Sequence, residues 1–153
     1  MRSDDSAFEL LVSSFLSLVG QDSAQSQGVM GFEFDTEAYS VAVWPVGEDQ
    51  LMVQVAVAAL QAGELVDPDL LLMLHRLNED ARSEHGWTAT IDAQDQLLLY
   101  ALRPLRGTDA QALQVAVAAG LDRAEALSAM LAHTAPPQMQ DDNTPADPQA
   151  LRV

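Results

Sequence analysis

The residues best placed to do chemistry lie together near the middle of the chain. His75 and Glu79 are four residues apart, and Asp80, Glu84 and His85 follow closely. On a helix this spacing stacks His75 and Glu79 on one face, where they could share a proton or bind a metal ion. An isolated pair of this kind is more typical of a solvated helix face with local ion pairing. We therefore predict neither a catalytic residue nor a metal ligand here.

Other signatures of catalysis are weak. The chain has no cysteine, which excludes disulfides, thiolate metal sites and cysteine nucleophiles. Gly28 and Gly31 precede an expected strand, but the lysine and third glycine of a phosphate-binding loop are missing. The N-terminal serines form no nucleophile elbow, and the three histidines have no evident pairing with them. The sequence predicts a protein that is not an enzyme and carries no cofactor.

The charge balance restricts the kinds of partner. The chain has 23 acidic and 7 basic residues, for a formal charge of −16. Such a surface repels phosphate backbones and anionic membranes, so we expect no nucleic-acid partner, whereas a basic polypeptide is allowed. The apolar run at 70–74 is far too short for membrane insertion, and the acidic start at residues 2–5 does not resemble a signal peptide. We therefore expect a cytoplasmic protein.

A helix is expected to open the chain. Ser6 and Glu9 have the spacing of a capping box, in which two side chains satisfy free backbone N–H groups at a helix start. The apolar side chains that recur at helical spacing are Phe8, Leu11, Val12, Phe15 and Val19. Leu10, Leu16 and Leu18 widen this apolar face beyond what one side of a surface helix needs. The pattern predicts surplus apolar surface on the first helix.

Three strands are expected next, because apolar residues then recur with a period of two. The three runs lie at 32–34, 39–43 and 51–57. The short polar connections at 35–38 and 46–49 favour antiparallel hairpins. Pro45 has no backbone N–H, which places it at the end or exposed side of the second strand. The polar stretch at 21–27 is expected to be a loop.

A second helix is predicted over 67–83. Asp67 is a favourable capping residue, and Pro68 suits the first helical position. The apolar stripe of this helix consists of Leu70, Met73, Leu74, Leu77 and Ala81. Leu71 and Leu72 add an apolar flank that one core contact would not bury, which indicates an interface.

A second hairpin and a third helix follow. The two alternating runs, joined by a turn at 93–95, lie at 87–91 and 97–102. Thr108 and Gln111 form another capping box before a long helix. Its apolar stripe consists of Leu113, Val117, Leu121, Ala124, Leu127 and Leu131. Gly120 weakens this helix by up to ~1 kcal/mol relative to alanine, which longer-range packing can offset.

The resulting fold class is α+β. Its order is helix, three strands, helix, two strands and helix, with a twisted antiparallel sheet flanked by helices. We assign residues 1–132 to a single domain, because 153 residues suit one hydrophobic core. From His133 onward, Pro, Asp and Gln replace the apolar pattern, so residues 133–153 are expected to form a disordered acidic tail.

This order of elements resembles the class I type III secretion chaperones, the Tir chaperone family. The likeness extends over residues 6–132. The local patterns that carry it are FELL at 8–11, LLLMLHRLN at 70–78, and LLLY at 97–100 followed by Pro104 and a long final helix. The leucine-rich run that ends in Asn78 is the most telling. The loop at 21–30 and the tail from Pro136 are not needed by the fold that the resemblance implies.

The resemblance implies a homodimer that binds the amino-terminal region of a secreted effector and keeps it soluble and secretion-competent. By analogy, the first helix and the first sheet would offer the client apolar grooves and a strand edge. The client-binding residues would be Phe8, Leu11, Val12, Phe15, Val19, Phe32 and Phe34. The second helix and the strand that begins at Trp87 would form the two-fold interface. The interface residues would be Leu70, Leu71, Leu74, Leu77, Asn78, Trp87 and Ala89.

A different class of protein is also compatible with the sequence. An acidic inhibitor, such as an antitoxin, an immunity protein or a DNA mimic, would mask a basic site on its partner by charge. Salt distinguishes the two hypotheses, because binding led by charge weakens steeply with ionic strength and binding led by apolar grooves does not.

Overall fold

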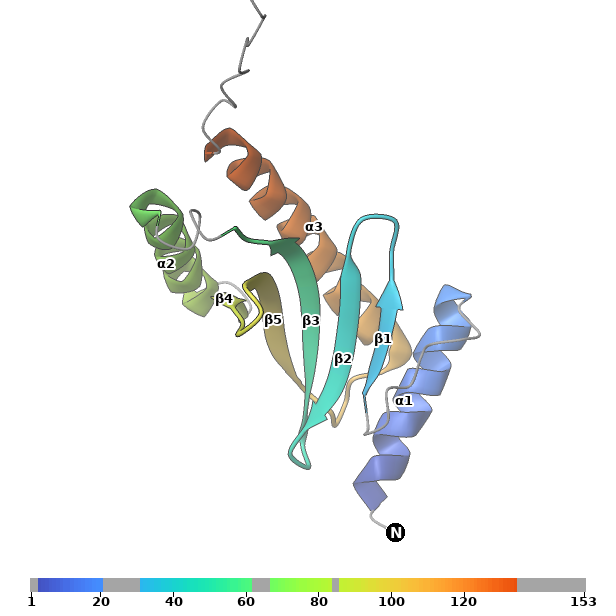
Figure 1. The fold of residues 1–153 in the computed structure, drawn as a ribbon. Coiled ribbons are helices and arrows are strands. Elements are labelled where there is room, and N and C mark those ends of the chain that lie inside the picture. The colour runs from blue at the N-terminus through green and yellow to red at the C-terminus, as the bar shows by residue number, and fades with distance from the viewer. Residues whose placement is uncertain (1–2, 21–30, 62–66, 84–85, 135–153) are drawn as a thin grey trace, which may run out of the picture.

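The computed structural model describes residues 3–20, 31–61, 67–83 and 86–134. In chain order the elements are α1 (Ser3–Val19), β1 (Phe32–Asp35), β2 (Ser40–Val46), β3 (Gln50–Ala59), α2 (Pro68–Ser83), β4 (Trp87–Ile91), β5 (Gln96–Pro104) and α3 (Ala110–Thr134). The predicted α+β order is confirmed (Figure 1). The loop predicted at 21–27 and the tail beyond residue 134 lie outside the described residues.

The five strands form one antiparallel sheet in the order β1-β2-β3-β5-β4. Its register places Val41 opposite Val55, and Val55 opposite Leu99. Pro45 lies beyond the last β1–β2 pair, so its missing N–H interrupts no bond to β1, as predicted. The sheet therefore has two edges, β1 on one side and β4 on the other.

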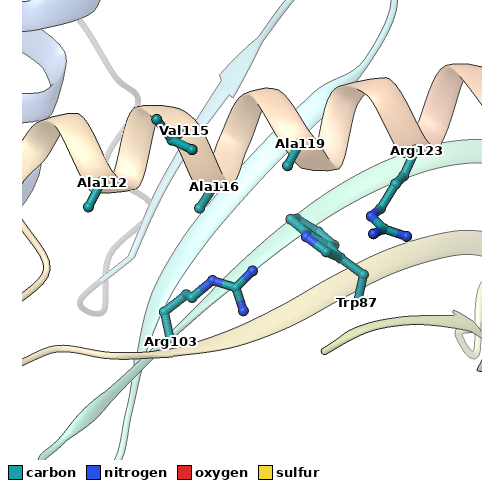
Figure 2. Close-up of a pocket in the computed structure, with 7 residues that line it drawn as sticks. All are labelled: Trp87, Arg103, Ala112, Val115, Ala116, Ala119 and Arg123. Carbon is teal, nitrogen blue, oxygen red and sulfur yellow. The ribbon is translucent and has the colours of Figure 1, made fainter. Parts of the chain in front are cut away.

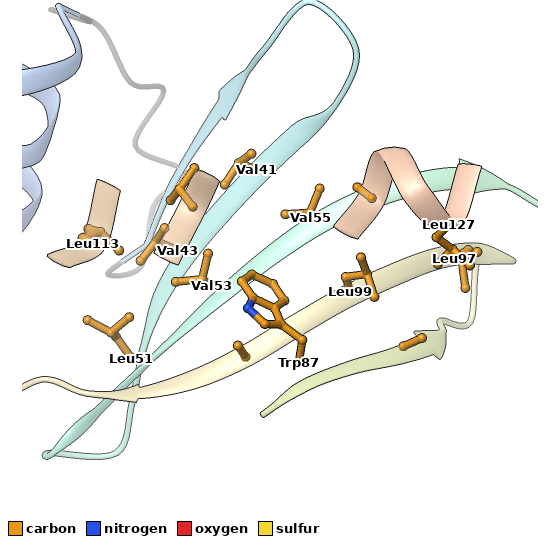
Figure 3. Close-up of a cluster of buried hydrophobic side chains, with 14 of the residues drawn as sticks. Val41, Val43, Leu51, Val53, Val55, Trp87, Leu97, Leu99, Leu113 and Leu127 are labelled. Atoms are coloured by element: carbon orange, nitrogen blue, oxygen red, sulfur yellow. The ribbon is translucent and has the colours of Figure 1, made fainter. Parts of the chain in front are cut away.

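The core lies between one face of the sheet and α3, with α1 beside β1 and α2 beside β4 (Figure 1). Val41, Val43, Val53 and Val55 point from β2 and β3 into this layer (Figure 3). The predicted stripe of α3 faces them: Leu113, Val117, Ala124 and Leu127 are buried, and Leu121 and Leu131 pack against the cluster. Because the chain has few aromatic residues, valine and leucine supply most of the packing.

The start of α2 is confirmed and two other helix starts are corrected. Asp67 caps α2, since its carboxylate accepts a hydrogen bond from the backbone N–H of Asp69 at 3.0 Å. Helix α1 begins at Ser3 rather than at the capping box of Ser6, because the first turn of a helix also tolerates Ser and Asp. A capping-box spacing therefore does not prevent an earlier start.

The cap of α3 is Asp109 and not the predicted Thr108. The Asp109 carboxylate accepts a hydrogen bond from the N–H of Ala112 at 2.8 Å. The Thr108 hydroxyl instead donates to the carbonyl oxygen of Pro104 at 2.6 Å and so belongs to the end of β5. At its other end α3 includes His133, predicted to open the tail, whose Nδ1 lies 2.7 Å from the carbonyl oxygen of Ala129. A free carbonyl near a helix end is a favourable partner for such a side chain.

Side chains also close the hairpin turns. The hydroxyl of Thr36 accepts a hydrogen bond from the N–H of Tyr39 at 2.9 Å, so Tyr39 lies in the turn and not in the strand predicted at 39–43. The turn predicted at 93–95 is confirmed, and Asp92 organises it by accepting from the N–H groups of Gln94 and Gln96. Both connections are thus short and locally bonded.

Helix α3 approaches the sheet closely at Gly120. A Cβ atom at this position would overlap Cη2 of Trp87 and lie 2.9 Å from its Cζ2. Trp87 is itself 2% exposed, so its ring has little room to move. The packing of the indole against Gly120 is the longer-range contact that offsets the poor helix propensity of glycine.

We expect Gly120→Ala to lower the free energy of unfolding by about 1 to 3 kcal/mol, the usual effect of overpacking a core. Urea denaturation measures it. In a Trp87→Phe background, which lacks the outer ring of the indole, the same change should be neutral or stabilising. Equal effects in the two backgrounds would show that the indole does not require glycine at this position.

Candidate functional site

Helix α1 divides its apolar residues between the core and the surface. Phe8, Leu11 and Phe15 are buried within the chain. Leu10 is 65% exposed and Leu18 is 50% exposed. The predicted apolar surplus on this helix therefore exists in the single chain. It consists of Leu10 and Leu18, which widen the apolar face. The stripe predicted to bind the client lies mostly inside the chain.

A cluster of three phenylalanines attaches α1 to β1. The ring centroid of Phe15 lies 5.7 Å from that of Phe32 and 5.8 Å from that of Phe34, and the rings of Phe32 and Phe34 are stacked 6.0 Å apart. Contacts of this geometry add to the free energy of apolar burial. The cluster holds the first helix against one edge of the sheet.

The predicted client-binding residues thus separate into two groups. Phe8, Leu11, Phe15 and Phe32 are buried, whereas Val12, Val19 and Phe34 are half buried. Their role in client binding stays a prediction. Leu10 and Leu18 were missing from the predicted set, although the width of the apolar face was a signal that pointed to them.

The two edges of the sheet differ in what occupies them. At the β4 edge, the side-chain amide of Asn78 donates to the carbonyl oxygen of Ala89 at 2.9 Å and accepts from its N–H at 2.7 Å. One side chain of α2 thereby provides both bonds that a neighbouring strand would make. Within the described ranges β1 pairs only with β2, so its outer edge has no strand beside it.

Helix α2 presents an apolar flank next to the β4 edge. Leu71 is 47% exposed and Leu72 is 48% exposed, as the sequence pattern indicated. The other predicted interface residues contribute little surface to the single chain. Leu70, Leu74, Trp87 and Ala89 are buried, and Leu77 and Asn78 are half buried. The interface itself stays a prediction.

The face of the sheet that carries the even-numbered residues Trp44 of β2, Met52 of β3, and Tyr100 and Leu102 of β5 offers further apolar surface. Trp44, Met52 and Tyr100 are half buried there, and Leu102 is exposed. Trp44 also packs against Gly31, where a Cβ atom would lie 2.5 Å from its Cε3. This face is mixed in character, since Gln54 lies among the apolar side chains.

The residues first considered for chemistry form a solvated pair. The Nε2 atom of His75 lies 3.5 Å from Oε1 of Glu79, and both side chains are largely exposed. The described part of the chain contains no group of three or more residues placed to bind a metal ion. Among the same residues, no helix is long and apolar enough to cross a bilayer. The features that stand out are therefore apolar surfaces and one unpaired sheet edge.

The chain matches the model of a known protein family. A family model described as the Tir chaperone protein (CesT) family matches residues 10–128, which confirms the resemblance inferred from the sequence. No curated protein sequence matches the chain significantly.

Solved structures share the fold at low sequence identity. The Yersinia pestis type III secretion chaperone SycH, in complex with a stable fragment of YscM2, is 18% identical, with a TM-score of 0.61 over 80% of this chain and 99% of that one. A chain of the ExsC–ExsE complex is 16% identical, with a TM-score of 0.70 over 86% and 97%. A chain of the HopA1–SchA chaperone–effector complex is 9% identical, with a TM-score of 0.69 over 84% and 98%.

The closure of the β4 edge by Asn78 makes a testable contribution to stability. We expect Asn78→Ala to lower the free energy of unfolding by about 1 to 3 kcal/mol, because two backbone groups of Ala89 lose their partner. Glu79→Ala, an exposed neighbour on the same helix, should stay within about 0.5 kcal/mol of the natural chain. Urea denaturation compares the two variants, and equal stabilities would contradict the role assigned to Asn78.

Proposed function

The chain belongs to the Tir chaperone protein (CesT) family, and from this premise we propose how it works as an effector-binding chaperone of type III secretion. Proteins with the same fold are described in complex with partners, as SycH with a fragment of YscM2, ExsC with ExsE, and SchA with HopA1. By analogy, this chain binds the amino-terminal region of a secreted effector and keeps it soluble and secretion-competent. The observation that carries the proposal is that α1, which exposes Leu10 and Leu18, is attached through Phe15 to β1, a strand whose outer edge has no partner among the described residues.

The client surface consists of the outer face of α1 and the edge of β1. Leu10 and Leu18 are eight residues apart, or about 12 Å along the helix axis. The exposed residues around them include Ala7, Ser14 and Ser17, whose small side chains leave the leucines prominent. An extended client segment would place apolar side chains against these leucines and pair its backbone with β1.

The buried members of the predicted client set act beneath this surface. Phe15 and Phe32 fix the position of α1 relative to β1 through their ring contacts. Val12, Val19 and Phe34 are half buried and would border the client directly. In this arrangement the client binds to a preformed surface, which lowers the entropy lost on association.

Two copies of the chain form a homodimer through α2. Leu71 and Leu72 supply the exposed apolar centre, and Leu70 and Leu74 support it from within the core. A two-fold interface uses the same patch twice, so a leucine flank on one helix is repeated by the partner copy. Asn78 already binds the backbone N–H and carbonyl of Ala89, so β4 cannot pair with a strand of the partner copy at this residue. The contact between the copies would therefore be made by side chains of α2.

The remaining properties follow from the same role. We place the protein in the cytoplasm, without enzymatic activity and without a cofactor, since its family consists of chaperones and the His75–Glu79 pair is solvated. Residues 1–132 would act as one chaperone domain whose last helix continues to Thr134. The acidic surface would exclude nucleic acid and keep the protein soluble.

We expect Leu10→Glu and Leu18→Glu, singly and together, to weaken client binding while the chain stays folded. The client would bury these leucines, so a charge in their place should cost at least about 1.4 kcal/mol of binding free energy. This loss corresponds to a tenfold rise in the dissociation constant. The measurement is isothermal titration calorimetry with the amino-terminal segment of a polypeptide that co-purifies with this chain from its native cell.

Met130→Glu, which changes an exposed apolar residue of α3, is the matched control and should bind normally. Apolar binding should also change little between low and high salt. Steep loss of affinity with salt, together with normal binding by the leucine variants, would favour the acidic inhibitor instead.

The dimer is tested by Leu71→Glu combined with Leu72→Glu. Placing two charges at the centre of an apolar two-fold interface should convert the dimer to a monomer at micromolar concentration, because each charge would be desolvated against its copy. Light scattering coupled to gel filtration gives the mass. Gln111→Glu adds a charge at an exposed polar position and should leave the mass unchanged. A natural chain that is already monomeric would contradict the proposed homodimer.

A further inference from the structure

The outer edge of β1 offers free backbone hydrogen-bonding groups at Glu33 and Asp35. The N–H of Thr36 donates to the carbonyl oxygen of Tyr39 at 2.8 Å, so these two residues form a hydrogen-bonded pair next to the β1–β2 ladder. In an antiparallel ladder such pairs alternate with pairs that exchange no bonds. Counting back from Thr36 therefore leaves Glu33 and Asp35 unbonded to β2, and their N–H and C=O groups point to the outer edge.

The same two residues carry the carboxylates of β1. Their side chains alternate with those of Phe32 and Phe34, which face the core, so they point to the sheet face opposite α3. Glu33 is half buried, and its Oε1 accepts a hydrogen bond from the hydroxyl of Ser40 at 2.8 Å, which orients the carboxylate. Asp35 is exposed. Because a carboxylate accepts several hydrogen bonds, Glu33 can bind a further donor.

The half of the chain that forms this edge has no basic residue. The sequence contains no Lys, Arg or His over residues 3–74, a stretch that includes α1 and β1 to β3. In Figure 1, α1 and β1 lie at one end of the sheet, and α2 and β4 lie at the other. Arg103 of β5 and Arg123 of α3 line a pocket with Trp87 of β4 (Figure 2). A strand that approaches β1 therefore meets carboxylates with no basic side chain from α1 or the first three strands beside them.

These carboxylates select among the strands that could pair with β1. Side chains directly opposite each other on neighbouring strands interact, and opposite charges are favourable there while like charges are unfavourable. Pairing of two β1 edges would bring the carboxylates of two copies together, so the edge is protected against self-association. An acidic segment would be rejected for the same reason. A basic segment gains from the same two side chains.

We propose that the client segment that pairs with β1 carries Lys or Arg at two positions separated by one residue, opposite Glu33 and Asp35. The residues between and beside these positions are apolar, and they point to the side of the sheet on which Phe15 of α1 contacts Phe32 and Phe34. The edge thus favours an alternation of basic and apolar residues. This inference rests on the proposed function, because it specifies the polypeptide that binds the same surface.

The probes are three capped peptides, acetyl-Leu-Lys-Val-Lys-Leu-amide and its counterparts with Gln or Glu in place of both Lys. NMR follows the backbone amide signals of the full ¹⁵N-labelled chain, and those of Glu33 and Asp35 should shift saturably. The Lys peptide should bind about three- to tenfold more tightly than the Gln peptide, the combined effect of two cross-strand charge pairs. The Glu peptide should bind most weakly. Added salt should reduce this preference and change the binding of the Gln peptide little.

Charge-changing variants locate the interaction. Glu33→Gln combined with Asp35→Asn should reduce the preference for the Lys peptide to within about twofold, and Glu33→Lys combined with Asp35→Lys should reverse it. Glu48→Gln combined with Glu125→Gln removes two exposed carboxylates away from β1 and should keep the preference. Circular dichroism checks that each variant is folded. If an edge variant does not fold, the comparison of the three peptides on the natural chain still decides the proposal.

Equal binding of the three peptides would overturn the inference, as would a preference that survives in the Glu33→Gln, Asp35→Asn variant. Unmoved amide signals of both residues at millimolar peptide would also overturn it. The co-purified client segment separates this failure from that of the proposed function. If Leu10→Glu still weakens its binding while the peptides show no preference, only the basic pattern is wrong. If Leu10→Glu and Leu18→Glu also bind it normally, the proposed client surface is wrong as well.

Discussion

The indole of Trp87 occupies the space that a side chain would take at Gly120, and this contact sets how closely α3 lies on the sheet. The valines of β2 and β3 reach the leucines of α3 only at this spacing, because apolar packing weakens quickly once surfaces separate. Helix α1 then packs against both α3 and the phenylalanines of β1. The position of the first helix, and thus of its exposed leucines, depends on a contact made by two other elements.

The same arrangement gives the two ends of the sheet different properties. At the β4 end, a single asparagine satisfies the edge, and the helix that carries it turns Leu71 and Leu72 outward. At the β1 end, the phenylalanine cluster fixes a helix beside a strand whose outer side has no described partner strand. One end is thus suited to contact between folded surfaces, and the other to an incoming extended chain.

The order of elements was predictable because each one has a local signal. The period of apolar residues changes from helical to alternating, and Asp67 with Pro68 marks a helix start without help from distant residues. The capping residue of α3 was harder to predict, since Thr108 and Asp109 are both favourable at the start of a helix. The choice depends on Pro104, whose carbonyl takes the threonine hydroxyl.

Periodicity alone could not decide which side of α1 faces inward. Its apolar residues surround more than half of the helix, and only the positions of Phe32, Phe34 and α3 bury Phe8 and Phe15 and expose Leu10 and Leu18. The pairing of Asn78 with Ala89 joins residues eleven apart across a helix–strand connection, and the contact of Trp87 with Gly120 joins β4 to α3. Such features depend on tertiary distances, which a local pattern does not contain.

The strong negative charge and the exposed leucines are compatible because they act over different distances. Charge repulsion extends for about 8 Å at physiological salt and opposes association beyond the proposed dimer through the leucines of α1. Apolar attraction acts only at contact. It therefore favours partners that can come close to the chain despite its negative charge. A neutral or basic client segment meets this condition, and an acidic one would need a local positive site to offset the repulsion.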